Sequence, residues 1–149
     1  MGLPVRQYWK LVGATYDLRL KWENAFEAAG LDAVIFPPAA LPALPHGSSK
    51  DLTPAFSYTF LANLLHWPAG VVPVTTVRPE EEEYRMETLP PNQRDTIARF
   101  AEKALRGSEG LPVGVQIMTL PFKDELALFV MKEVEKAVKF KDIPKLAQL

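Results

Sequence analysis

The sequence contains no cysteine, which excludes disulfide bonds, thiolate zinc sites and a cysteine nucleophile. It also lacks an excess of either charge, because 17 Lys and Arg residues balance 18 Asp and Glu residues to a net charge of −1. This balance gives no electrostatic basis for binding nucleic acid or an anionic membrane surface. No apolar run approaches the roughly 20 residues that a transmembrane helix needs.

A signal-peptide pattern is missing as well, since Arg6 and Lys10 interrupt any apolar segment near the N-terminus. Met1 need not be the start of the gene product, so this absence excludes nothing further. What remains is ordinary for a soluble globular chain: 149 residues, 48% apolar and 23% charged. This length suits one domain with a real hydrophobic core.

The stretch from Thr53 to Val77, TPAFSYTFLANLLHWPAGVVPVTTV, organises the sequence. Thr53 is predicted to cap a helix, with Pro54 at its first position. Pro68 and Gly70 should end that helix. The β-branched run that follows is typical of a strand covered on both faces, and Pro73 places this strand near an edge or a bulge. One apolar stripe is expected on the helix: Phe56, Phe60 and Leu64.

Periodicity predicts six further segments around this stretch. A long helix over 4–29 should bury one broad face and stop at Gly30, and a strand over 31–36 follows. A proline-rich extended segment covers 37–45. The remaining predictions are a helix over 92–106, a strand over 111–119 and a helix over 123–140, with a frayed tail beyond Lys141.

Each of the two later helices has a predicted inward face. For the helix over 92–106 these residues are Ile97, Phe100, Ala101, Ala104 and Leu105. For the last helix they are Leu126, Val130, Val134 and Ala137. The complete order, four helices alternating with three strands, is an α/β pattern. Three strands are too few to cover four helices, so large apolar faces should stay uncovered, as in a piece of a larger sheet.

Candidate catalytic groups are sparse. The segment Gly47-Ser48-Ser49-Lys50 contains serines and a lysine, but adjacent positions do not converge as a relay requires, and a turn before a helix is the better interpretation. His46 and His66 are the only histidines, and neither has an obvious carboxylate partner. A serine–histidine relay and a metal pair are therefore weaker interpretations of these histidines. The better interpretation of His66 is a polar residue at a helix C-terminus.

Two acidic segments are also better explained without catalysis. Asp124-Glu125 is better explained as acidic residues that stabilise the start of the last helix than as an acid/base pair. The run from Glu80 to Glu83 is typical of a solvated loop.

The Thr53–Val77 stretch and the later segment Gly110-Leu-Pro-Val-Gly-Val-Gln116, in this order and spacing, resemble the C-terminal part of amidase-signature serine hydrolases, most closely the fatty-acid amide hydrolases. The resemblance runs from the first helix to about Lys136. It implies that residues 1–149 are the C-terminal section of a large mixed sheet wrapped in helices.

The resemblance also implies a mechanism: a serine nucleophile, a bridging serine and a lysine base, with no metal or organic cofactor. A lysine base has to be buried to lose its proton at neutral pH. In the family these three residues lie upstream of the part that this chain resembles, so no catalytic residue is expected here. The chain alone is predicted to be inert.

Phe56 and Phe60 have two interpretations. On general grounds they are core residues, whereas the resemblance places their helix in the wall of an acyl-chain channel. The resemblance brings Ile97 and Gln93 near channel positions where mammalian relatives have aromatic residues. This departure affects acyl specificity, which is not carried over. The predicted channel residues are therefore Phe56, Phe60 and Ile97.

For the complete enzyme, the resemblance implies hydrolysis of a lipid amide to a fatty acid and an amine. Its implied partners are the lipid amide, the upstream part of the same amidase and a second copy in a homodimer, with an intracellular location peripheral to membranes. Two alternatives stay open for this chain. One is a protein that binds apolar ligands without hydrolysing them, and the other is an interaction module that pairs through an uncovered sheet edge. The chain could also be a fragment without independent function.

Overall fold

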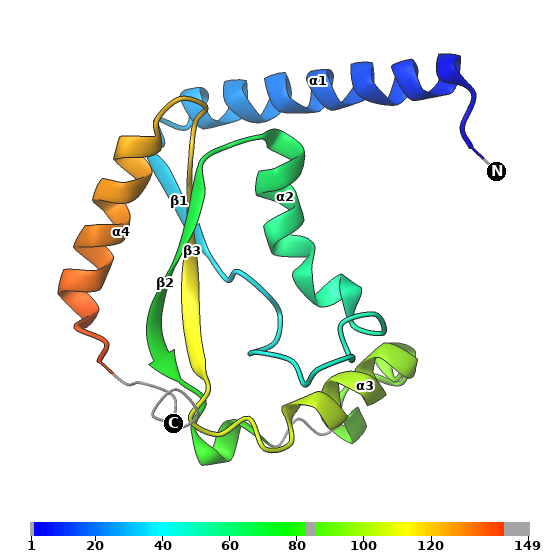
Figure 1. Ribbon diagram of the computed structural model, residues 1–149, viewed down its shortest axis with the longest axis vertical. Coiled ribbons are helices and arrows are strands. Elements are labelled where there is room, and N and C mark those ends of the chain that lie inside the picture. The colour runs from blue at the N-terminus through cyan, green and yellow to red at the C-terminus, as the bar shows by residue number, and fades with distance from the viewer. Residues whose placement is uncertain (1, 83–85, 142–149) are drawn as a thin grey trace.

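The computed structural model describes residues 2–82 and 86–141. Its elements follow the predicted order and alternate four helices with three strands, which confirms the α/β class for the described residues (Figure 1). Their bounds are α1 Val5–Ala28, β1 Ala33–Phe36, α2 Ser57–Leu65, β2 Ala69–Thr76, α3 Thr96–Leu105, β3 Pro112–Thr119 and α4 Asp124–Val138. The predicted fraying beyond Lys141 lies outside the described residues.

The last strand in sequence, β3, lies in the middle of the sheet, whose order is β1-β3-β2. Both pairings are antiparallel. Strand β2 forms one edge, and its register shifts between Pro73 and Thr75, as the proline predicted. The prediction that β2 is covered on both faces is wrong for this chain, because the Val71 side chain is 46% exposed. The exposed side chains of β2 alternate with half-buried and buried ones, so only one of its faces is well covered in the described structure.

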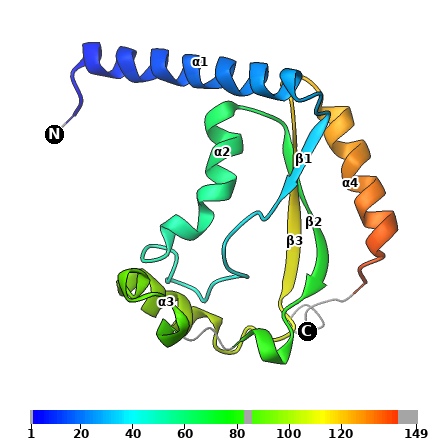
Figure 2. The ribbon, with the colours of Figure 1, turned by 180° about the vertical axis from the view of Figure 1, so that it is seen from behind.

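Helices lie on both faces of the sheet, with α4 along β2 and β3 and with α1 and α2 on the other side (Figures 1 and 2). Gly70 of β2 lets α4 approach closely, because a Cβ at this position would overlap the sulfur of Met131. The predicted inward stripe of α4 is therefore partly wrong. Ala127 is its buried residue and Ala137 is exposed, since the helix is rotated toward Ala127 and Met131.

On the opposite face, the main core joins α1, α2 and β3. Met118, Leu65 and Phe26 are fully or nearly fully buried there, and the Phe26 and Trp67 rings meet edge to face at 5.0 Å between centroids. Phe26 is the only buried residue of α1. The prediction of one broad buried face is wrong for its N-terminal half, which extends beyond the other elements (Figure 1). Its exposed apolar side chains are Val5, Tyr8, Trp9, Leu11, Tyr16 and Leu20.

Helix α2 begins later than predicted. Residues Thr53–Phe56 form a turn of 3-10 helix, and Thr53 caps nothing because its Oγ1 donates to the Ser49 carbonyl oxygen at 3.1 Å. Pro54 occupies the first turn, as expected. At the other end, His66 adopts a left-handed conformation with φ 55° and ends the helix just before Pro68. This placement confirms His66 at a helix C-terminus.

Helix α3 also starts later, at Thr96, because Asp95 is its N-cap and accepts a hydrogen bond from the Ala98 N–H at 2.8 Å. Its buried residues are Ala98, Ala101, Ala104 and Leu105. Two residues predicted to face inward, Ile97 and Phe100, are 43% and 37% exposed. The reason is that α3 packs on Leu52 and the proline-rich segment, and the residues that make this contact are the small Ala101 and Ala104.

Candidate functional site

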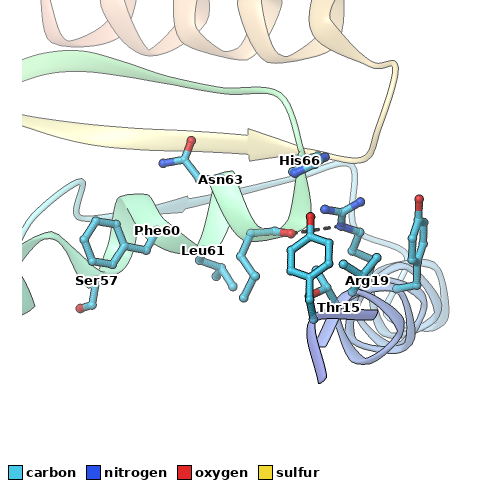
Figure 3. A pocket seen from close by; sticks show the side chains of 11 residues that line it. Thr15, Arg19, Ser57, Phe60, Leu61, Asn63 and His66 are labelled. Atoms are coloured by element: carbon cyan, nitrogen blue, oxygen red, sulfur yellow. Dashed lines mark hydrogen bonds between the residues drawn. The ribbon is translucent and has the colours of Figure 1, made fainter. Parts of the chain in front are cut away.

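A pocket of about 790 Å³ lies between α1 and α2 (Figure 3). We call it the α1–α2 pocket. Phe60 and Leu61 of α2 form part of its wall, and Phe60 is 48% exposed. Its lining residues are Tyr8, Val12, Thr15, Tyr16, Arg19, Ser57, Phe60, Leu61, Asn63, Leu64 and His66. The pocket therefore combines an apolar and aromatic wall with a few polar groups.

Three polar side chains of the α1–α2 pocket, those of Thr15, Arg19 and Asn63, hydrogen-bond to the helix backbone. The Arg19 Nε donates to the Leu64 carbonyl oxygen at 3.0 Å, and its guanidinium lies 5.5 Å from the centre of the Tyr16 ring. Thr15 and Asn63 donate to backbone carbonyl oxygens one helical turn before them. Arg19 thus ties α1 to the C-terminal end of α2, where a cation is favourable.

A serine–histidine relay does not form in this pocket. Ser57 and His66 lie at opposite ends of α2, a nine-residue helix about 13 Å long (Figure 3). A relay needs its two side chains within hydrogen-bonding distance. The α1–α2 pocket can bind an apolar group, but it holds no nucleophile and base in contact.

Phe56 lies in a different pocket of about 440 Å³, at the end of the sheet where the proline-rich segment crosses. We call it the sheet-end pocket. It is lined by Pro37, Pro38, Ala39, Ala40, Leu41, Pro42, Ala43, Phe56, Val71, Pro73, Pro112, Val113 and Gly114. The predicted stripe of α2 is therefore divided. Phe56 is half-buried above one pocket, whereas Phe60 and Leu64 face the other.

Ile97 lies on α3 and lines neither of these two pockets. The described part of the chain thus does not bring the three predicted channel residues together. Their role in a channel stays a prediction. The prediction that Phe60 and Ile97 are core residues is wrong, because both side chains are more than two-fifths exposed.

The loop before α2 is a turn, as predicted. Ser48 donates its hydroxyl to the Pro45 carbonyl oxygen at 2.7 Å, and Gly47 has φ 84°. The described residues contain no group of three or more His, Asp or Glu side chains that could hold a metal ion. His46 and His66 are both exposed. Neither a catalytic relay nor a metal centre is formed by these groups in the described part of the chain.

The acidic run after β2 begins with an ion pair in solvent. The Arg78 guanidinium donates to Glu81 at 2.8 Å and the Arg78 backbone N–H donates to the same carboxylate at 2.9 Å. The side-chain bond is the main cause that lowers the pKa of Glu81, and it raises the pKa of Arg78. Glu80 and Glu81 are exposed, which agrees with a solvated segment, while Glu83 lies outside the described residues.

One buried polar residue was missed by sequence reasoning. Gln116 of β3 is 2% exposed, and its Nε2 has no hydrogen-bond partner among the described residues. An unpaired buried amide is costly, so such a group usually has a partner. A glutamine flanked by apolar residues within the strand Pro112–Thr119 was the available signal.

The two recognised motifs lie side by side in the sheet, because β2 of the first pairs with β3 of the second. Gly70 of the first motif lies against α4, and Gly114 of the second lies against β2, where a Cβ would be 2.7 Å from Val71 Cγ1. A family model described as Amidase matches residues 5–128, which span α1 to the first turns of α4. This chain belongs to the amidase family.

Curated relatives agree with this assignment. The amidase chain is 44% identical over 111 residues to Fatty-acid amide hydrolase 1 of Sus scrofa, covering 74% of this chain and 19% of the relative. It is 38% identical over 108 residues to Fatty acid amide hydrolase 1 of Caenorhabditis elegans, covering 72% of this chain and 18% of the relative. The chain thus spans about a fifth of the length of these relatives.

Among the described residues of the amidase chain, no helix is both long and apolar enough to cross a bilayer.

Proposed function

We propose that this chain is the C-terminal section of an amidase that hydrolyses lipid amides to a fatty acid and an amine. The observation that carries the proposal is its 44% identity to a fatty-acid amide hydrolase over 111 residues that make up only 19% of that enzyme. Most of such an enzyme lies outside the region that this chain resembles. The nucleophilic serine, the bridging serine and the lysine base are assigned to that remainder.

In this proposal the chain contributes binding and structure rather than chemistry. Phe60 and Phe56 form walls of two separate pockets, and each binds part of an acyl chain, which gains about 0.8 kcal/mol for each buried methylene. The three strands close one part of the enzyme's sheet. No metal or organic cofactor takes part. The reaction needs the upstream part of the amidase as partner, with homodimerisation and a membrane-peripheral location as further inferences from the family.

A chimera tests this function. This chain replaces the matching segment of the Sus scrofa enzyme, and hydrolysis of a long-chain fatty-acid amide is measured by release of the amine. We expect the chimera to turn over the amide and the isolated chain to show no turnover. A chimera that melts cooperatively but is inactive would argue against the proposal, and so would turnover by the chain alone.

The same chimera also distinguishes the amidase proposal from its main alternative, a protein that binds apolar ligands. A protein that binds apolar ligands without hydrolysis would be stabilised by a fatty acid as the isolated chain, through preferential binding to the folded state. The α1–α2 pocket, with its aromatic wall, is the observation that favours this alternative. Fatty-acid stabilisation of the isolated chain, together with an inactive chimera, would favour it over the amidase.

A further inference from the structure

The two edges of the sheet differ in their capacity to accept another strand. Within the described residues, β1 and β2 are the outer strands on either side of β3. Strand β2 carries Pro73 and a register shift beside it, both of which disfavour pairing at an edge. Strand β1 consists of Ala33-Val34-Ile35-Phe36, without proline or charge. By this comparison, β1 has the open edge.

The direction of the β1 backbone groups follows from one hydrogen bond on β3. The Thr119 N–H donates to the Pro68 carbonyl oxygen at 3.1 Å, on the β2 side of the strand. Thr119 therefore does not bond to Ala33, which lies opposite it in β1. Directions alternate along a strand, so Val34 and Phe36 bond to β3, whereas the N–H and C=O groups of Ala33 and Ile35 point away from the sheet.

Apolar surface lies beside this open edge. A pocket of about 510 Å³ adjoins β1 and is lined by Trp22, Val34, Ile35, Phe36, Ser57, Tyr58, Leu61 and Met118. The Ile35 side chain is 53% exposed, and α4 covers the neighbouring strands β2 and β3. A strand placed against β1 would direct alternate side chains into this pocket and the others beside Ile35. Both sets would be apolar, as in a strand that is buried on both faces.

We propose that the outer edge of β1 pairs with an apolar strand from the upstream part of the amidase. This inference rests on the proposed function and names the contact through which the two parts join. The occupant follows from the chain's length relative to its homologues, because it spans 19% of the Sus scrofa enzyme. The remaining four-fifths has to meet this section somewhere, and β1 offers unpaired backbone groups beside an apolar pocket.

Amide hydrogen exchange in the chimera tests the pairing residue by residue. The Ile35 amide is compared with that of Val71, which by the same alternation points outward from β2 and is 46% exposed. We expect exchange at Ala33 and Ile35 to be slower than at Val71 by roughly 100-fold, because paired strand amides exchange only on opening. Equal exchange at the two edges, or faster exchange at Ile35, would overturn the proposal.

Two matched variants provide a second readout. Ile35→Lys should lower the melting temperature of the chimera and leave that of the isolated chain nearly unchanged, because the edge is open only in the isolated chain. Val71→Lys, on the other edge, should have a smaller effect on the chimera. Equal effects of the two variants would contradict the inference.

Pairing with a second copy is a distinct outcome. If the isolated chain dimerises, if Ile35→Lys abolishes the dimer, and if Ile35 in the chimera still exchanges fast, then the occupant is another copy and the proposal is overturned. Exchange reports backbone pairing and not turnover. A folded chimera that is inactive but protects Ile35 would therefore count against the proposed function alone.

Discussion

At the scale of single residues, glycine has the clearest structural role in this chain. Gly114 needs no unusual backbone conformation, but a Cβ there would lie 2.7 Å from Val71 Cγ1 and 2.9 Å from the Val72 carbonyl oxygen. One of these neighbours is backbone within the sheet, so it cannot move aside easily. The requirement is close approach of β2 to β3, and it explains a glycine in the middle of a strand.

Replacing Gly114 by alanine should therefore destabilise the chain. We expect Gly114→Ala to lower the free energy of unfolding by about 1–3 kcal/mol, as overpacking does in tightly packed interiors. The measurement is urea-induced unfolding followed by circular dichroism. Gly13→Ala is the matched control, because nothing lies within 4 Å of a Cβ at this position of α1. The control should be neutral or stabilising by up to about 1 kcal/mol, and similar losses for both variants would contradict this account.

At the scale of elements, local signals decided which segments became helices, and for α3 a side-chain cap decided where the helix begins. Asp95 sets the start of α3 because its carboxylate accepts the Ala98 N–H, whereas Thr53 donates to the preceding turn and caps nothing. Helix α3 then packs through small residues on Leu52. Its few buried large side chains make the cap a substantial part of its stability.

Removing the cap of α3 should have a measurable cost. Asp95→Ala leaves the Ala98 N–H without its partner, and we expect a loss of about 1 kcal/mol in the free energy of unfolding. Asp95→Ser retains a capping oxygen and should lose much less. Thermal unfolding of the two variants and the parent chain checks this ranking. A Ser variant as unstable as the Ala variant would show that the cap is not the cause.

At the scale of the whole molecule, the main feature is the apolar surface that remains uncovered. The N-terminal half of α1 presents Tyr8, Trp9 and Leu11 to solvent, and Ile35 is exposed at the sheet edge. Large apolar side chains exposed in such number are typical of a surface that another part of a protein covers. It agrees with a section of a larger enzyme, in which the remainder would cover these faces.

This exposure predicts how tryptophan fluorescence responds to a soluble quencher. Trp9 is 64% exposed and Trp67 is 5% exposed within the core. We expect acrylamide to quench part of the emission of the isolated chain readily, and Trp9→Phe to remove most of that accessible fraction. An accessible fraction unchanged in Trp9→Phe would mean that α1 is covered, by a second copy or by its own fold.

The fold was largely predictable from particular residues. Gly30 marked the end of α1, and it has the positive φ that such a stop requires. Pro73 placed β2 at an edge with a bulge. The candidate site was less predictable, because Phe56, Phe60 and Ile97 were grouped by resemblance while the structure distributes them over two pockets and α3.

The sequence by itself determined the family, the order of elements and the absence of cysteine chemistry, because these depend on composition and on neighbours a few residues apart. Only the tertiary structure decided which face of each helix is buried, since that depends on what lies opposite. Helix α1 has a long apolar face, yet only Phe26 finds a partner that fully buries it. The tertiary structure also decided that β3 lies between β1 and β2, because strand order is set by contacts between residues distant in sequence.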